Sequence, residues 1–178
     1  MLVIMKKIGG FTIVELLIVI VVIAILAAIS IVAYNGIQDR TNKSKVDADI
    51  NSLIKAVQLA RVDKSQTLLQ ITNNTCTRCG CPYANGDMTD YSTLPKTHVC
   101  WLRYYDFLDK VGAASGVSLN GLRSGDPWGS PYIIDENEGE AGGCGRDSIQ
   151  SVGKGRNSNA GTSLSVVNIA LSGFSGCA

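Results

Sequence analysis

Six cysteines give this 178-residue chain its clearest candidate chemistry. Cysteine thiolates bind zinc when several lie close together, and cysteine pairs form disulfides in oxidising compartments. Residues 76–81, with the sequence CTRCGC, have the close spacing of a zinc site, and His98 with Cys100 could complete a ligand set. Disulfides are the stronger hypothesis, because the chain has no second CxxC pair, although the sequence leaves the pairing open. The candidates are Cys76, Cys79, Cys81, Cys100, Cys144 and Cys177.

Glu15 is the second residue of interest, because it stands near the start of a long apolar run. Between Ile13 and Val32 the only polar side chains are those of Glu15 and Ser30. An ionised carboxylate in hydrocarbon costs about 3 to more than 10 kcal/mol, so this charge requires a compensating partner.

The apolar run itself predicts a membrane helix. About twenty helical residues at a rise of ~1.5 Å span a bilayer core of roughly 30 Å. The alternative is a secretory signal peptide cut near Ala24, Ala27 or Ala28, but the apolar region of a signal peptide is usually only about 7 to 15 residues long. The length of the run favours the membrane helix.

The block KKIGGFTIVEL, residues 6–16, resembles the processing site of type IV prepilins and type II secretion pseudopilins. The resemblance implies that a prepilin peptidase on the cytoplasmic side cuts between Gly10 and Phe11 and that the new terminal amine is methylated. Gly10 lacks a Cβ, which lets the backbone approach a protease closely. Glu15 becomes the fifth residue of the mature chain, where this family carries its characteristic glutamate.

The charges around this block predict the topology and the domains. Lys6 and Lys7 precede the apolar run and hold the leader in the cytoplasm by the positive-inside bias, so the chain crosses the cytoplasmic membrane once, N-terminus in. We expect a cleaved leader over residues 1–10, a transmembrane and filament-core helix over 11–34, and an exported globular domain over 35–178. After assembly the subunit would lie in a filament at the cell surface.

Two roles for Glu15 follow from this arrangement. In a filament of packed helices, the amine created at Phe11 of a neighbouring subunit is a suitable partner for the carboxylate in a low dielectric. In a free subunit, Glu15 could instead reach the headgroups from the first helical turn, where the helix dipole also favours a negative charge.

Beyond the membrane the sequence predicts an α+β fold of the pilin type: a long N-terminal hydrophobic helix packed on a small antiparallel sheet with disulfide-stabilised loops. Apolar residues at three-to-four spacing predict an amphipathic helix over residues 44–71, with a bend or loosening near Gly36. A second helix is expected over 101–114. The expected strands are THVCWL (97–102), PYIID (131–135), SIQSV (148–152) and LSVVNIAL (164–171).

Two loop segments extend the resemblance. Residues 126–132, DPWGSPY, resemble a segment of major pseudopilins, and residues 151–155 resemble the glycine-rich turn that follows it. The resemblance implies a calcium site, for which Asp147 and Asn157 are the candidate ligands, although Lys154 stands where an acidic residue would be expected. It also implies a disulfide that closes the C-terminal loop, with Cys144 as the suggested partner of Cys177.

Composition argues against several functions. The net charge of +1 gives no general attraction to nucleic acid, although the exported basic residues could converge into a DNA-binding stripe. A hydrolase is not expected, because the chain has one histidine and neither a GxSxG nor an HExxH motif. The scattered exported cations are Arg61, Lys64, Arg78, Arg103, Arg123, Arg146, Lys154 and Arg156.

The sequence therefore predicts a structural subunit of a type IV pilus, which serves adhesion, twitching motility or DNA uptake, rather than an enzyme with a cofactor. Its expected partners are further copies of itself, a prepilin peptidase and methyltransferase, an assembly platform, minor pilins and, before assembly, the membrane. The alternatives are a type II secretion pseudopilin, a DNA-binding minor pilin, and an anchored binding protein that never polymerises.

Overall fold

A long helix and a small α+β domain form the computed structural model. Contacts divide the chain into two units, Met1–Thr41 and Asn42–Ala178, and helix α1 (Ile13–Lys64) contributes to both. Helical hydrogen bonding in α1 continues through Gly36. The structure describes residues 11–82, 89–136, 147–153 and 165–169.

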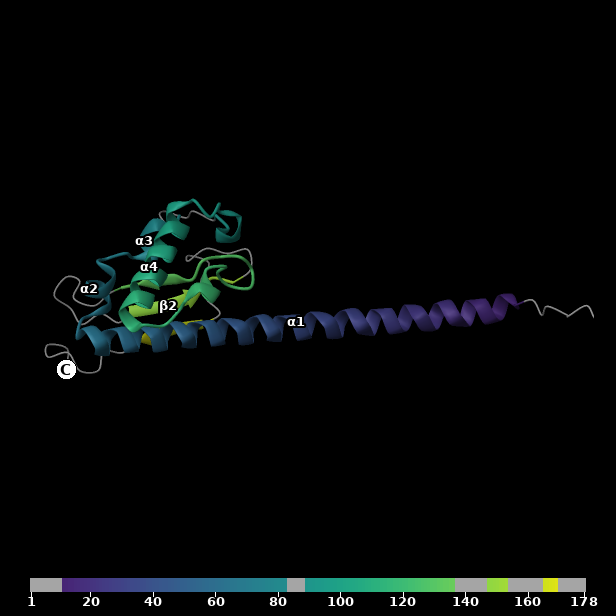
Figure 1. The fold of residues 1–178 in the computed structure, drawn as a ribbon. Helices are drawn as coiled ribbons and strands as arrows, with labels where there is room; N and C mark the ends of the chain where they lie inside the picture. The colour runs from purple at the N-terminus through teal and green to yellow at the C-terminus, as the bar shows by residue number, and fades with distance from the viewer. Residues whose placement is uncertain (1–10, 83–88, 137–146, 154–164, 170–178) are drawn as a thin grey trace, which may run out of the picture. The chain divides into compact units, whose positions relative to one another are not determined.

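In the first unit, the large apolar side chains of α1 are exposed. Figure 1 draws α1 as one continuous helical ribbon. The large apolar residues from Ile13 to Ile31 are between 47% and 84% exposed. Among the described residues, α1 is the one helix that is long and apolar enough to cross a membrane. Such a surface is unstable in water, so it requires lipid or other helices as a cover.

In the second unit, α1 is amphipathic, and one face is buried. Val46, Ile50, Leu53 and Val57 are at most 1% exposed, which confirms the predicted apolar face. The predicted length is wrong, because α1 ends at Lys64 and the chain turns at Ser65, whose φ is 52°. A second helix then begins after Thr67.

The following segment forms short helices. A capping box between Thr67 and Gln70 starts α2 (Leu68–Thr72). It is followed by α3 (Thr77–Gly80) and by the 3-10 helix η2 (Tyr91–Thr93). A further 3-10 helix, η3 (Asn120–Leu122), comes later in the chain.

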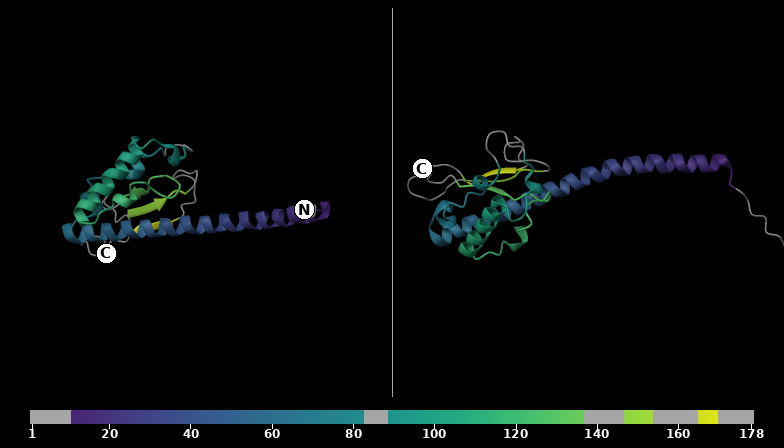
Figure 2. Two further views of the ribbon diagram at one scale, coloured as in Figure 1. Left: turned by 45° about the vertical axis from the view of Figure 1, so that its right-hand side comes forward. Right: turned by 90° about the horizontal axis from the view of Figure 1, so that it is seen from above.

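Helix α4 (Val99–Ser115) replaces one predicted strand. The expected strand over residues 97–102 is wrong, because the His98 Nδ1 atom accepts the backbone N–H of Cys100 and caps the helix there. The helix predicted over 101–114 is confirmed. Its buried face carries large aromatic residues that lie in one core with residues of α1. Figures 1 and 2 show α4 in the small domain at the C-terminal end of α1. These core residues of α4 are Trp101, Tyr104, Phe107, Leu108 and Val111.

Three strands form an antiparallel sheet in the order β1 (Ile133–Asp135), β2 (Asp147–Ser151) and β3 (Ser165–Ile169). They confirm the strands predicted at 131–135, 148–152 and 164–171. Ile134 opposes Ile149 in the register of β1 and β2, and both lie in the main core with α1 and α4.

Because neighbouring strand residues face opposite sides, Ile133 lies in a second cluster, with Tyr91 and Cys100. The sheet therefore has apolar contacts on both faces. The fold is α+β, as the sequence predicts.

Phe107→Ala should lower the free energy of unfolding of the domain by about 3–5 kcal/mol, because it empties a fully buried site between α4 and α1. The matched control is Leu102→Ala on the same helix, whose side chain is 53% exposed and whose truncation should change stability by less than about 0.5 kcal/mol. Urea unfolding in detergent, followed by tryptophan fluorescence, measures both. Equal effects would show that the packing of α4 is assigned wrongly.

Candidate functional site

The first turn of α1 holds Glu15 through Thr12. The Glu15 Oε2 atom accepts the Thr12 backbone N–H and the Thr12 hydroxyl, both at 2.8 Å, and the Thr12 Oγ1 atom accepts the Glu15 N–H at 3.2 Å. This reciprocal pair is a capping box, and it satisfies helical N–H groups that would otherwise lack partners. The Thr-x-x-Glu spacing is the sequence signal for the pair, and treating Glu15 only as an isolated charge misses it.

The other predicted processing residues are only partly described. Phe11, on the far side of the predicted cut, is 85% exposed. Gly10, Lys6 and Lys7 lie outside the described residues, so the cut and the leader charges stay predictions.

Ser30, the other polar residue of the apolar run, forms a hydrogen bond within its own helix. Its hydroxyl donates to the Leu26 carbonyl at 2.8 Å, one helical turn earlier. Because the donor is satisfied within the helix, the residue adds little cost to an apolar environment.

Four of the predicted cysteines form two disulfides, Cys76–Cys79 and Cys81–Cys100. Paired sulfurs are not available as zinc ligands, so the zinc hypothesis is wrong for these four. Within the part of the chain that the structure describes, no group of three His, Cys, Asp or Glu residues could hold a metal ion. Cys144 and Cys177 lie outside the described residues, and their pairing stays a prediction.

Glu136 is a buried carboxyl group that the sequence analysis did not single out. Its side chain is 1% exposed, and its Oε2 atom accepts the backbone N–H of Cys76 at 3.0 Å. Burial raises its pKa above the ordinary value, although hydrogen bonds from Thr72 and Cys76 oppose the rise. It follows strand β1 directly, in a segment whose sequence carries no motif.

Asp147, a predicted calcium ligand, is fully buried and forms an ion pair with Arg61 of α1. A guanidinium at the carboxylate supplies the positive charge that calcium would otherwise bring, so this residue does not fit a calcium site. Asn157 lies outside the described residues. The ion pair instead ties the end of α1 to the start of β2.

The DPWG segment forms a turn that is fixed to the sheet. Asp126 Oδ1 accepts the backbone N–H groups of Trp128 and Ser130, at 3.1 and 2.9 Å, and Oδ2 accepts the Ser151 hydroxyl at 2.7 Å. The backbone N–H of Gly153 donates to that same hydroxyl oxygen. The two segments that resemble pseudopilins are therefore joined through one buried carboxyl group. Burial raises the pKa of Asp126 above its ordinary value, although hydrogen bonds from Ser151, Ser130 and Trp128 oppose the rise.

Among the described residues, the cations predicted as a possible DNA-binding stripe have partners within the domain. Arg78 pairs with Asp135 at 3.0 Å, and Arg123 pairs with Asp109 at 2.5 Å. Lys64 and Arg61 also pair with carboxylates, and Arg103 donates to backbone carbonyls. Such pairing reduces the positive potential available to a phosphate backbone. The remaining candidates lie outside the described residues: Arg146, Lys154 and Arg156.

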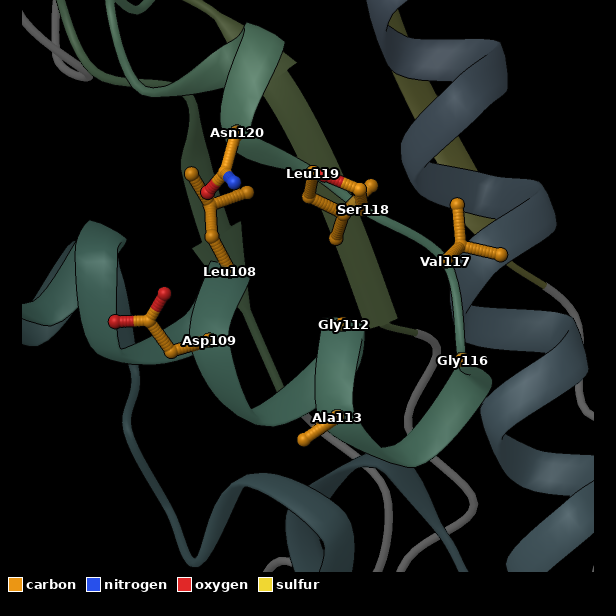
Figure 3. Close-up of a pocket in the computed structure, with 9 residues that line it drawn as sticks. All are labelled: Leu108, Asp109, Gly112, Ala113, Gly116, Val117, Ser118, Leu119 and Asn120. Atoms are coloured by element: carbon orange, nitrogen blue, oxygen red, sulfur yellow. The ribbon is translucent and has the colours of Figure 1, made fainter.

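A pocket of about 350 Å³ lies where the last turns of α4 meet the following loop (Figure 3). Asp109 is the charged residue in its lining, and its carboxylate pairs with Arg123. The rest of the lining is apolar, small or amide-bearing, as at Leu119, Gly112 and Asn120. The one hydroxyl group in the lining is that of Ser118, and the lining contains neither a histidine nor a cysteine.

Comparison with known families identifies the N-terminal segment. Residues 5–31 match the family model of the prokaryotic N-terminal methylation motif. Comparison with curated proteins and with solved structures gives no match. The matched residues include Gly10, Phe11 and Glu15, and the motif indicates a type IV pilin-like or pseudopilin precursor that prepilin peptidase processes.

Glu136→Gln should change the pH dependence of stability. Because the native pKa of Glu136 is raised, its contribution to stability is fully present below its ordinary pKa of 4.5 and is lost as the pH rises through the native pKa. Relative to the wild type, the variant should therefore gain stability from about pH 4 to pH 7 in urea unfolding.

Asp106→Asn is the control of opposite sign. Burial tends to raise the pKa of Asp106, but hydrogen bonds from Lys110 and Thr75 outweigh it and lower the pKa. Its contribution to stability is thus present above the ordinary pKa of 3.8 and is lost as the pH falls, so this variant should lose stability relative to the wild type as the pH rises from about 2 to 5. Parallel pH profiles of the two variants would contradict both assignments.

Proposed function

We propose that the chain is a structural subunit of a type IV pilus, cut between Gly10 and Phe11, methylated at Phe11 and polymerised through α1. The observation that carries this proposal is the methylation motif at residues 5–31 on a helix whose apolar side chains are exposed all round. Subunits with this motif are structural components rather than enzymes.

The exposed apolar surface of α1 would be covered by lipid before assembly and by neighbouring helices after it. Before assembly, lipid covers the first half of α1, and Lys6 and Lys7 keep the leader on the cytoplasmic side. After assembly, the same surface packs against identical helices of neighbouring subunits, which form the filament core. One surface thus serves both as an anchor and as the polymerisation interface.

Glu15 has a role at each stage. In the free subunit Thr12 supplies both hydrogen bonds to the carboxylate, at the positive end of the helix dipole. In the filament the first turn of α1 moves from the membrane–water interface to a position buried among helices. The hydrogen bonds from Thr12 do not neutralise the negative charge of the carboxylate there. A neighbouring Phe11 amine then provides the opposite charge.

The exported domain supports a filament at the cell surface. Two disulfides close loops around α3 and the start of α4, and disulfides persist in oxidising, extracellular conditions. Adhesion, twitching motility and DNA uptake are all compatible with such a filament, whose partners would be the assembly platform and minor pilins.

A type II secretion pseudopilin is the second candidate, and one observation favours it. The DPWG turn and the Ser151–Gly153 segment are the two regions that resemble major pseudopilins, and Asp126 joins them. The ion pair of Asp147 with Arg61 weighs against the calcium site that the same resemblance implies.

Glu15→Ala should abolish filaments while leaving membrane insertion and processing intact. Removing one partner of a buried ion pair costs about 3–5 kcal/mol per subunit contact, which is enough to prevent polymerisation. Sheared surface material, quantified by immunoblot and electron microscopy in cells with a pilus assembly system, measures the effect.

Ser30→Ala is the matched control for that experiment. Ser30 lies in the same apolar run but donates only to the Leu26 carbonyl, so its loss should leave filaments at the wild-type level. Filaments at normal yield from the Glu15 variant would contradict the proposal and favour an anchored protein that never polymerises.

A further inference from the structure

The two disulfides differ in the access that solvent has to them. Cys79 is exposed, although its partner Cys76 is only 3% exposed. Cys81 and Cys100 are 8% and 0% exposed, and both lie in the second apolar cluster with Tyr91 and Ile133. Solvent therefore has access to Cys79 of the first disulfide and very little access to either cysteine of the second.

The sulfur of Cys76 accepts a hydrogen bond that would stabilise it as a leaving thiolate. The backbone N–H of Cys79 donates to Cys76 Sγ at 3.1 Å. A hydrogen bond to a sulfur strengthens when that sulfur becomes negative, so this contact lowers the energy of a Cys76 thiolate. Attack at Cys79, which releases Cys76, is thus favoured both by access and by the stability of the leaving group.

The backbone around Cys76 is held without help from the disulfide. The buried carboxyl group of Glu136 accepts the Cys76 N–H, and Arg103 Nη1 donates to the carbonyls of Thr75 and Cys76 at 2.9 and 3.2 Å. The second oxygen of Glu136 has no hydrogen-bond partner among the described residues, although the side chain is 1% exposed. The backbone N–H of Cys79 also donates to the Cys76 carbonyl at 3.1 Å. These backbone contacts remain when the S–S bond is broken, so the two cysteines stay close and the bond can form again.

We propose that Cys76–Cys79 is a thiol–disulfide exchange site that accepts two electrons from a dithiol. One thiolate of the dithiol attacks Cys79 Sγ, an S–S bond forms between them, and the Cys76–Cys79 bond breaks with its electron pair on Cys76. The Cys76 thiolate takes a proton from water. The second thiol of the reductant loses its proton and attacks the reductant's own sulfur in the mixed disulfide, so that the bond to Cys79 breaks with its electron pair on Cys79 Sγ, which takes up a proton. The dithiol is then a disulfide, and both cysteines are thiols.

The buried Cys81–Cys100 disulfide holds the domain while this happens. It joins the segment after α3 to the first turn of α4, outside the exchange site. Reduction of the first disulfide should therefore leave the fold in place. This activity belongs to the exported domain and does not depend on polymerisation.

Limited reduction of the full-length chain in detergent micelles tests the proposal. The probe is dithiothreitol, and free thiols are blocked at intervals with an alkylating reagent and identified by peptide mass spectrometry. Cys76 and Cys79 should become alkylated at least about tenfold faster than Cys81 and Cys100, with the fluorescence spectrum of the folded domain unchanged. Equal rates, or faster reduction of Cys81–Cys100, would overturn the proposal.

The site of attack is tested separately with glutathione, whose first attack forms a mixed disulfide that is trapped when the released thiol is alkylated at once. Arg78 lies between the two cysteines, so tryptic cleavage after Arg78 places Cys76 and Cys79 on different peptides. The glutathione adduct should be found on Cys79 and the alkyl group on Cys76. An adduct mainly on Cys76 would contradict the assignment of the attacked sulfur.

Discussion

The exposed apolar surface of the first half of α1 is the constraint on which the rest of the chain depends. Fourteen large apolar side chains from Ile13 to Ile31 are about half exposed or more. Even at about 1 kcal/mol each, their removal from water outweighs the cost of taking one carboxylate with them. Glu15 is therefore carried into an apolar environment, and the Thr12 capping box reduces the cost by satisfying the carboxylate locally.

The second unit is built as a small core that uses the other half of the same helix. Val46, Ile50 and Leu53 of α1 pack with the aromatic face of α4, and the buried Arg61–Asp147 pair joins the end of α1 to the sheet. The helix is thus shared between an apolar surface that needs partners and a domain that is packed on its own. Disulfides stabilise the loop-rich side of that domain, where a small core contributes little.

Much of this follows from local sequence patterns, and the exceptions have physical causes. Periodicity predicts the buried face of α1, and β-branched runs predict the three strands. The sequence predicts a strand at the start of α4, because the β-branched and aromatic residues around Val99 are typical of strands. In the structure His98 caps a helix at this position. Asp49 of α1 accepts the Tyr132 hydroxyl at 2.8 Å, a contact across 83 residues that no local pattern contains. The environment of Glu136 is likewise produced only by tertiary packing.

The central claim is that this chain is a prepilin whose helix becomes the core of a filament. The most direct measurement is N-terminal sequencing and intact mass of the protein in sheared surface material. The account predicts a chain that begins at Phe11 and is about 14 Da heavier than its sequence mass, after correction for disulfides, because of one methyl group. A chain that keeps Met1 in the membrane, or one that begins after an alanine near residue 28, would contradict it.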